Sequence, residues 1–374
     1  MTAVALDSGP KRLIGVQGLR GLAVLLVILV HLHHTEERFV SGAAWLGAWN
    51  SLGIAGVDIF LVVSGFVLTY LALGRFGDAQ HVKAYVYARV TRLYPMYMLL
   101  TLLLVPVYLA APELFNTTEG HRVNLWRSVF LVPDVHLPLI PVAWTLHHEL
   151  YFYIVLTVML MFAERHLPVL ILAWAAVTTA LVVWGLTVPR AQQGAFERVL
   201  FNPINFEFIL GMSAAWSFRR RRAARAAAPA VAVLALLWVM VGVALWVGLT
   251  GEWWVSDFWR VWVYGVPATL LIWSIVAMEL DRGWVFMRPL AWIGDGAYSI
   301  YLTHLMVLVV LGRAWQELGL QGNWQNPVFL ALSIAVALYF GYTLFLRVEA
   351  PILRWLRLHD PLRPRSLARA APAR

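Results

Sequence analysis

Ten apolar stretches of 16 to 22 residues constrain what this chain can fold into. They are residues 13–34, 52–73, 93–111, 144–163, 168–188, 203–218, 229–250, 261–280, 297–313 and 327–347. A helix rises ~1.5 Å per residue, so ~20 apolar residues cross a hydrocarbon core of ~30 Å. Backbone polar groups inside a bilayer must be hydrogen-bonded within the protein, which favours helices. We therefore predict an all-α integral membrane protein with about ten transmembrane helices and no soluble domain.

The composition indicates the same class. The chain has 374 residues, of which 61% are hydrophobic and 13% are charged, and its mean hydropathy is +0.72. Soluble globular proteins carry about 25% charged residues. The sequence contains no cysteine, which excludes disulfide bonds, thiolate nucleophiles and thiolate metal ligands. No apolar run precedes Leu13, so we expect no cleaved signal peptide.

The lysines and arginines indicate the orientation. With the N-terminus in the cytoplasm, 21 of the 29 basic residues lie on the cytoplasmic side, 7 lie on the outer side, and Arg20 lies within a helix. Because cytoplasmic loops are enriched in Lys and Arg, we predict that both termini are cytoplasmic. The same distribution accounts for the net charge of +9 without a nucleic-acid partner. We assign residues 1–350 to the transmembrane domain and 351–374 to a basic cytoplasmic tail, which lies on anionic membrane lipids or is disordered.

The first apolar stretch carries two ionisable residues, Arg20 and His31. Eleven residues are about three helical turns, so the two side chains lie on nearly the same face, ~16 Å apart along the axis. An ionisable residue inside a membrane usually marks a functional site, and a histidine accepts a proton near neutral pH. The alternative is that Arg20 extends to the lipid headgroups and His31 only marks the end of the helix.

Two further segments place charges at the membrane boundary. Asp58 lies near the start of the second apolar stretch, where it either orients a histidine or caps the helix. Arg89 and Arg92 are three residues apart and share a helical face, which suits phosphate binding or ordinary membrane anchoring. Pro95 is expected to end or kink that helical turn.

The stretch beginning PVAWTLHHELYFY carries Trp144, His147, His148 and Glu149 at the outer boundary. Adjacent histidines point to different faces of a helix, and the sequence has no HExxH spacing. We therefore expect no metal site here. Glu207 is a further acidic residue within an apolar stretch.

The stretch AYSIYLTHLMVL is interrupted by polar side chains. Tyr301 and His304 are three residues apart and share a face, either as packing residues or as part of a site. Near the C-terminus, Glu349 is expected to pair with a neighbouring arginine in the segment RVEAPILRWL.

Six segments in chain order carry a resemblance to a known family. They are LRGLAVLLVILVH, GVDIFLVVSGFVLT, RVTRLYPMY, WTLHHELYFY, IGDGAYSIYLTHLMVL and VEAPILRWL. Together they resemble the acyltransferase-3 family of bacterial membrane acyltransferases, including its Arg-x₁₀-His spacing at Arg20 and His31. The order of the segments and the fourth segment are most similar to the exopolysaccharide O-acetyltransferase branch.

The resemblance implies transfer of an acyl group, usually acetyl, from cytoplasmic acyl-CoA to a hydroxyl of a sugar or polysaccharide. It implies a multi-pass protein of the bacterial inner membrane that uses acetyl-CoA as donor and an envelope glycan as acceptor. The expected roles are catalysis for His31, Arg20, Glu149 and Asp58; donor binding for Arg20, Arg89, Arg92, Tyr298 and His304; and acceptor binding for Trp144 and His148. Direct transfer and a transient acyl-histidine both fit these residues.

Two alternatives remain open from the sequence. In a transporter or flippase of an envelope glycan precursor, Arg20, Asp58 and Glu207 would line a path, although we find no internal repeat. The other superfamily of histidine-dependent membrane acyltransferases is expected to carry a buried Asn/His pair. In the acyltransferase-3 interpretation, Arg20 and His31 face one shared hollow that coenzyme A enters from the cytoplasm.

Overall fold

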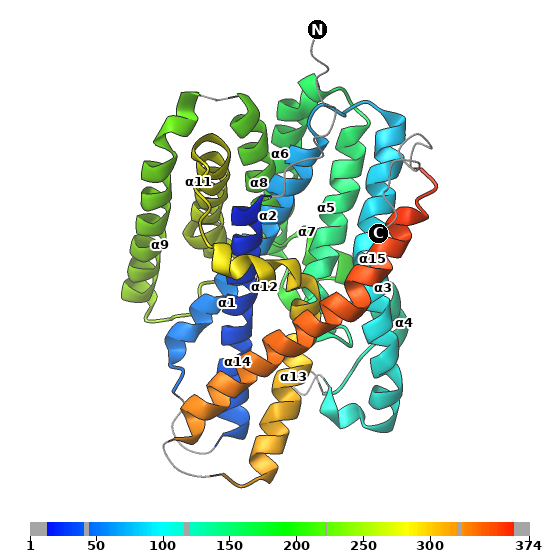
Figure 1. Ribbon diagram of the computed structural model, residues 1–374, viewed down its shortest axis with the longest axis vertical. Helices are drawn as coiled ribbons and strands as arrows, with labels where there is room; N and C mark the ends of the chain where they lie inside the picture. Colours follow the sequence, from blue (N-terminus) through cyan, green and yellow to red (C-terminus); the bar gives the residue numbers. More distant parts are fainter. Residues whose placement is uncertain (1–12, 41–44, 116–119, 221–222, 321–323, 363–374) are drawn as a thin grey trace.

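The computed structural model describes residues 13–40, 45–115, 120–220, 223–320 and 324–362, and every regular element among them is a helix (Figure 1). Ten long helices match the ten predicted stretches: α1 (Ile14–Phe39), α2 (Ala55–Ala72), α3 (Ala79–Ala110), α5 (Trp144–Leu160), α6 (Leu167–Thr187), α8 (Asn205–Arg220), α9 (Ala228–Thr250), α11 (Val266–Arg282), α13 (Ala297–Glu317) and α14 (Gln325–Leu344). Within the described ranges, 8 helical segments are long and apolar enough to cross a membrane. Helices α5 and α8 are shorter, with 17 and 16 residues. The all-α membrane class is confirmed.

Short helical turns connect or extend these long helices. The α-helical ones are α4 (Leu125–Phe130), α7 (Ala195–Leu200), α10 (Asp257–Arg260), α12 (Ala291–Asp295) and α15 (Ala350–Leu358). The 3₁₀ turns are η1 (Ala48–Ile54), η2 (Pro112–Leu114), η4 (Pro141–Ala143), η5 (Glu164–His166), η6 (Arg190–Gln192), η7 (Ala223–Ala227) and η9 (Arg288–Leu290). Two π-helical turns, η8 (Val261–Gly265) and η10 (Phe345–Glu349), join α10 to α11 and α14 to α15.

The third helix differs from the sequence prediction. It begins at Ala79 rather than near residue 93, because the Asp78 side chain accepts a hydrogen bond from the Gln80 backbone N–H at 2.8 Å and caps it. It then continues through Pro95 and Pro106 to Ala110, so the predicted helix end at Pro95 is wrong. Membrane helices tolerate proline because neighbouring groups satisfy the freed backbone carbonyls.

Contacts between loops join segments that are far apart in the sequence. At one end, the Gly74 N–H donates to Glu164, and Arg225 pairs with Asp281 at 3.1 Å. At the opposite end, Arg198 donates to the backbone oxygen of Val135 at 2.5 Å. Each contact therefore joins loops that the sequence places on the same membrane side.

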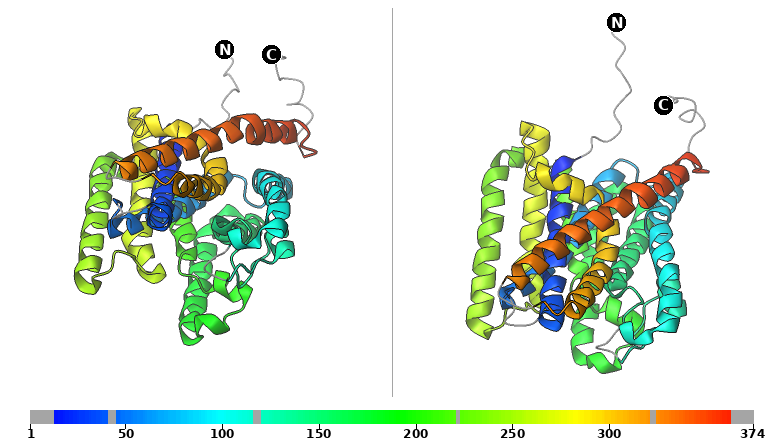
Figure 2. Two further views of the ribbon diagram at one scale, coloured as in Figure 1. Left: turned by 90° about the horizontal axis from the view of Figure 1, so that it is seen from below. Right: turned by 60° about the horizontal axis from the view of Figure 1, so that its bottom comes forward.

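Helix α14 crosses one face of the molecule diagonally and continues into α15, whose basic end reaches α3 (Figure 2). The predicted tail boundary at residue 351 thus falls inside a continuous helical rod. Residues 363–374, the remainder of the predicted tail, lie outside the described residues.

Helix α1 lies at the centre and packs against α2, α11, α12 and α13. Its first turn is capped from α11, because Glu279 accepts hydrogen bonds from the backbone N–H groups of Ile14 and Gly15 at 2.7 Å each. These N–H groups otherwise lack intrahelical partners. Farther along α1, a Cβ on Gly21 would lie 2.2 Å from the Leu290 oxygen, so only glycine allows this approach to the segment that leads into α12.

Helices α2 and α8 cross at two glycines. A Cβ on Gly65 would lie 2.4 Å from the Phe208 oxygen, and one on Gly211 would lie 2.2 Å from the Val62 oxygen. Close crossings at small residues gain van der Waals contact where the surrounding lipid is as apolar as the helices. This crossing fixes α2, and therefore fixes the wall that α2 contributes to the interior.

We predict that Gly211→Ala lowers stability by ~1–3 kcal/mol, because the new methyl group overlaps backbone atoms of α2. The measurement is the thermal unfolding midpoint of the detergent-purified protein. Gly248→Ala on α9 is the matched control, since nothing lies within 4 Å of a Cβ there. Equal midpoints for the two variants would contradict the prediction.

Candidate active site

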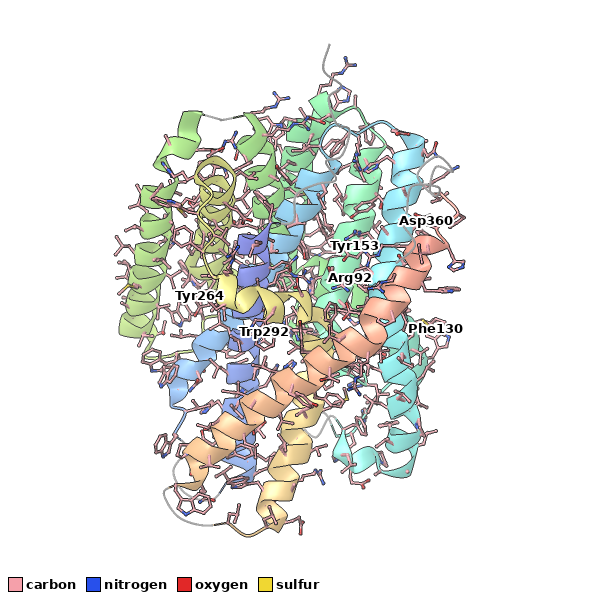
Figure 3. All side chains as sticks on the ribbon, viewed as in Figure 1. Arg92, Phe130, Tyr153, Tyr264, Trp292 and Asp360 are labelled. Atoms are coloured by element: carbon pink, nitrogen blue, oxygen red, sulfur yellow. The ribbon has the colours of Figure 1, made fainter. Side chains whose placement is uncertain are left out.

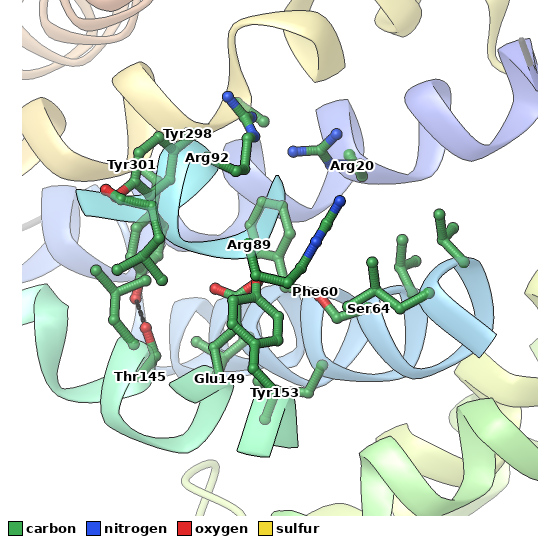
Figure 4. A pocket seen from close by; sticks show the side chains of 18 of the residues that line it. Arg20, Phe60, Ser64, Arg89, Arg92, Thr145, Glu149, Tyr153, Tyr298 and Tyr301 are labelled. Carbon is green, nitrogen blue, oxygen red and sulfur yellow. Dashed lines mark hydrogen bonds between the residues drawn. The ribbon is translucent and has the colours of Figure 1, made fainter. Parts of the chain in front are cut away.

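A cavity of about 190 Å³ lies among α1, α2, α3, α5 and α13 (Figure 4). Its polar lining residues are Gln17, Arg20, Ser64, Arg89, Arg92, Thr145, Glu149, Tyr153, Tyr298 and Tyr301. The remaining wall is apolar, with Phe60 and Leu61 among its members. Five segments that are far apart in sequence thus meet at one polar space inside a membrane protein.

Three guanidinium groups point into this cavity from two helices (Figure 4). Arg20 donates to the Gln17 side chain at 3.3 Å. Arg89 lies over the rings of Tyr85 and Tyr153 at 5.7 and 5.9 Å, and its Nε has no hydrogen-bond partner among the described residues. The predicted shared face of Arg89 and Arg92 is confirmed, because both line the cavity.

Arg92 is held by an acid from the other end of the chain. Its guanidinium pairs with the buried carboxylate of Glu349, which also accepts a hydrogen bond from the Ser299 hydroxyl at 2.5 Å. The prediction that Glu349 pairs with a nearby arginine is therefore wrong: the partner lies 257 residues away. The π turn η10 ends at Glu349, where helix α14 passes into α15.

Tyr298 and Arg92 form one wall of the cavity. The Arg92 guanidinium lies 5.1 Å from the centre of the Tyr298 ring, whose hydroxyl donates to the Leu93 backbone oxygen at 2.6 Å. Arg92 and Tyr153, which are labelled near each other in the view of Figure 3, both line the cavity. Tyr298 lines the cavity, and its role in donor binding stays a prediction.

Helix α5 contributes Thr145, Glu149 and Tyr153 to the cavity, whereas Trp144 and His148 of the same helix lie outside its lining. Glu149 accepts a hydrogen bond from the Tyr153 hydroxyl at 2.5 Å. His148 is buried and hydrogen-bonded to Asn205 at 2.9 Å, and its ring stands edge-on to Trp144 at 5.8 Å. Trp144 and His148 do not line the cavity, so an acceptor bound there would not touch them.

His31 does not line the cavity, although Arg20 does. Its ring centre lies 5.2 Å from that of His304, and the His304 ring lies 5.8 Å from that of Tyr301, which is a cavity residue. The expectation of one hollow shared by Arg20 and His31 is therefore wrong as stated. The two imidazoles instead lie beyond Tyr301, and His304 does not line the cavity that contains the arginines.

Tyr301 is fixed in place by α5 and the turn before it. Its hydroxyl donates to the Val142 backbone oxygen at 2.9 Å and is hydrogen-bonded to the Thr145 hydroxyl at 2.8 Å (Figure 4). Phe60 of α2 stands edge-on to the same ring at 5.9 Å. A ring held on three sides separates the arginine cavity from the two histidines.

Asp58 lies in a second buried cluster, away from the cavity lining. Its carboxylate accepts hydrogen bonds from Arg260 at 2.9 and 3.2 Å, and the two residues are 0% and 1% exposed. Helix α2 has no side-chain cap, and the hydrogen bonds of Asp58 within the described residues go to Arg260. Both predicted roles, capping the helix and orienting a histidine, are therefore wrong. By its position in the sequence, Arg260 counts among the 7 basic residues expected on the outer side, whereas in the structure it is buried against Asp58.

Glu207 lies beside this ion pair. It is 0% exposed, and both carboxylate oxygens lack a hydrogen-bond partner among the described residues. Its Cγ is 3.0 Å from the position of a Cβ on Gly265, so the Glu207 side chain packs closely against the backbone that leads into α11. Within the described ranges, no group of three or more His, Asp and Glu residues is placed to hold a metal ion.

We predict that Asp58→Ala destabilises the protein by ~3–5 kcal/mol, because Arg260 would remain buried without its partner. The measurement is the thermal unfolding midpoint in detergent, with Asp257→Ala as the control. Asp257 also contacts Arg260, at 3.3 Å, but its side chain is 37% exposed. A midpoint for Asp58→Ala equal to that of Asp257→Ala would contradict the prediction.

Known proteins similar to this chain cover most of its length. Residues 13–346 match the family described as the acyltransferase domain, type 3. The exopolysaccharide production protein ExoZ of Rhizobium meliloti is 27% identical over 324 residues, which cover 81% of this chain and 90% of that protein. A candidate peptidoglycan O-acetyltransferase of Bacillus subtilis, YrhL, is 26% identical over 347 residues, which cover 81% of this chain and 51% of that protein. The acyltransferase MdmB of Streptomyces mycarofaciens is 27% identical, with 94% of each chain covered. No solved structure matches significantly.

Proposed function

This chain belongs to the acyltransferase-3 family of membrane O-acyltransferases, and from that premise we propose that it moves an acetyl group from cytoplasmic acetyl-CoA to a sugar hydroxyl. The acceptor that we propose is an exopolysaccharide or another cell-envelope glycan. Two relatives support this choice, since one is named for exopolysaccharide production and another for peptidoglycan O-acetylation. The proposed location is the bacterial inner membrane with both termini in the cytoplasm, supported by the 21-to-7 distribution of basic residues.

The observation that carries the donor assignment is the meeting of three guanidinium groups in one cavity. Arg20, Arg89 and Arg92 bring three positive charges against the two carboxylates Glu149 and Glu349, which leaves an excess of one. Buried cations of this kind suit an anionic ligand, and arginine forks match phosphate oxygens. The phosphates of coenzyme A supply that charge.

The size of the cavity suggests which part of the donor enters it. Pockets that enclose a drug-sized ligand measure ~300–1,000 Å³, whereas this cavity measures about 190 Å³. It therefore suits one end of a long donor such as acetyl-CoA. In our proposal the phosphates meet the arginines and the thioester points toward Tyr301, on whose other side His304 and His31 lie.

In the proposed reaction, His31 takes the proton of the acceptor hydroxyl as a general base, which contributes ~10²–10⁴-fold to the rate. The oxygen attacks the thioester carbonyl and forms a tetrahedral oxyanion, which a hydrogen-bond donor beside the carbonyl stabilises. Arg20, in the arginine cavity, belongs to the proposed phosphate contacts of the donor. The carbon–sulfur bond then breaks. The sulfur leaves with the proton returned from His31, so the products are the sugar ester and free coenzyme A.

The transporter alternative loses its structural basis. It required Arg20, Asp58 and Glu207 to line one path. Arg20 lines the cavity, whereas Asp58 is paired with Arg260 and Glu207 lies beside that pair. No described cavity joins these three charges.

We predict that His31→Ala lowers acetyl transfer by at least ~100-fold while the protein remains folded, because the proposed base is lost. The assay follows radiolabel from acetyl-CoA into an envelope glycan fraction incubated with the purified protein. His34→Ala on the same helix is the control, since its side chain is 62% exposed. Full activity of folded His31→Ala would end the proposal.

We further predict that Arg89→Ala raises the KM for acetyl-CoA by ~10–100-fold, the loss expected for one hydrogen bond between charged groups. Arg357→Ala provides the control, since this exposed arginine lies on α15, outside the cavity. Steady-state kinetics at fixed acceptor concentration measure the change. An unchanged KM for Arg89→Ala would argue against phosphate binding at this residue.

A further inference from the structure

His304 is buried in an arrangement that fixes where its ring hydrogen lies. The residue is 0% exposed, and its Nδ1 lies 2.6 Å from the Tyr301 backbone oxygen. A carbonyl oxygen only accepts hydrogen bonds, so Nδ1 carries the hydrogen and donates it. Nε2 of the neutral ring therefore presents a lone pair.

That lone pair has no hydrogen-bond partner among the described residues. Burying a polar atom without a hydrogen-bond partner destabilises the folded protein, so each such atom calls for an explanation. The neighbouring imidazole is that of His31, whose ring centre lies 5.2 Å away with the ring planes tilted by 34°. When two imidazole rings at this separation face each other edge to edge, their facing nitrogens lie ~3 Å apart. That is a hydrogen-bond distance.

We propose that His304 is the positioning residue for His31: its Nε2 accepts a hydrogen bond from a ring N–H of His31 and directs the other His31 nitrogen toward the acceptor hydroxyl. This inference rests on the proposed function. Rotation of the His31 ring about its last side-chain bond makes the contact, and that torsion has a broad energy well. His304 thereby takes the place that a carboxylate occupies in a Ser-His-Asp triad.

The protons balance in this arrangement. His31 begins neutral, with its single ring hydrogen directed to His304. When it takes the hydroxyl proton it becomes an imidazolium, whose N–H to His304 is a charge-assisted hydrogen bond. The acquired proton later leaves with the thiol of coenzyme A. His304 keeps its hydrogen on Nδ1, bonded to the Tyr301 oxygen, throughout.

The decisive variants are His304→Leu and His304→Gln in the full-length purified protein. Loss of a group that orients a catalytic histidine costs ~10–100-fold in comparable sites. We expect kcat of His304→Leu to fall by that factor, with the KM for acetyl-CoA unchanged within about two-fold. His304→Gln, whose amide oxygen reaches the former Nε2 position, should recover a substantial part of kcat.

The shorter amide in His304→Asn is the matched control, because its oxygen does not reach that position. Equal kcat values for the Gln and Asn variants would overturn the inference, and this comparison stands even where His304→Leu does not fold. A raised KM for acetyl-CoA with unchanged kcat would also overturn it, since His304 would then bind the donor. If folded His31→Ala retains activity, the proposed function itself fails. If His31→Ala is inactive while folded His304→Leu is fully active, only the inference fails.

Discussion

A guanidinium group inside a bilayer must be paired, hydrated or neutralised by a ligand. Three such groups line one cavity of this protein, and the arrangement of the surrounding helices depends on them. Arg92 meets that requirement with Glu349, from the distant end of the chain. Arg89 lies against two tyrosine rings, and among the described residues Arg20 donates a hydrogen bond to the side chain of Gln17. Because pairing accounts for only part of the charge, the cavity retains an attraction for anions, and five helices must surround it to keep lipid away.

A second buried charge pair serves a different purpose. Asp58 and Arg260 are almost wholly enclosed where α2, α10 and α8 approach one another. Their charges compensate each other, so the pair offers little to a ligand and instead ties helices together at a defined register. The glycine crossing of α2 and α8 lies on the same helix and acts with it. The position of the α2 face that lines the cavity is therefore fixed by contacts on the opposite face of α2.

Between the arginines and the two histidines stands Tyr301, held by Val142, Thr145 and Phe60. In the proposed reaction, this division separates the recognition of the charged donor from the proton chemistry. It agrees with a reaction in which donor and acceptor approach one bond from different sides. The spacing of Arg20 and His31 along one helix then sets the distance between the two halves of the site, rather than placing both in one hollow.

Hydropathy and helical periodicity by themselves determined the ten helices and the shared face of Arg89 and Arg92. The resemblance of the sequence to a known family added Arg20, Glu149 and Tyr298 as candidate site residues, and these three line the cavity. These features depend on local properties of the chain. Only the tertiary structure decided that Glu349 binds Arg92, that Arg260 binds Asp58, and that His304 lies beside His31. Helices that are apolar on nearly every face carry no sequence pattern that identifies the helices they pack against. Close packing at glycines and the pairing of buried charges decide which helices become neighbours.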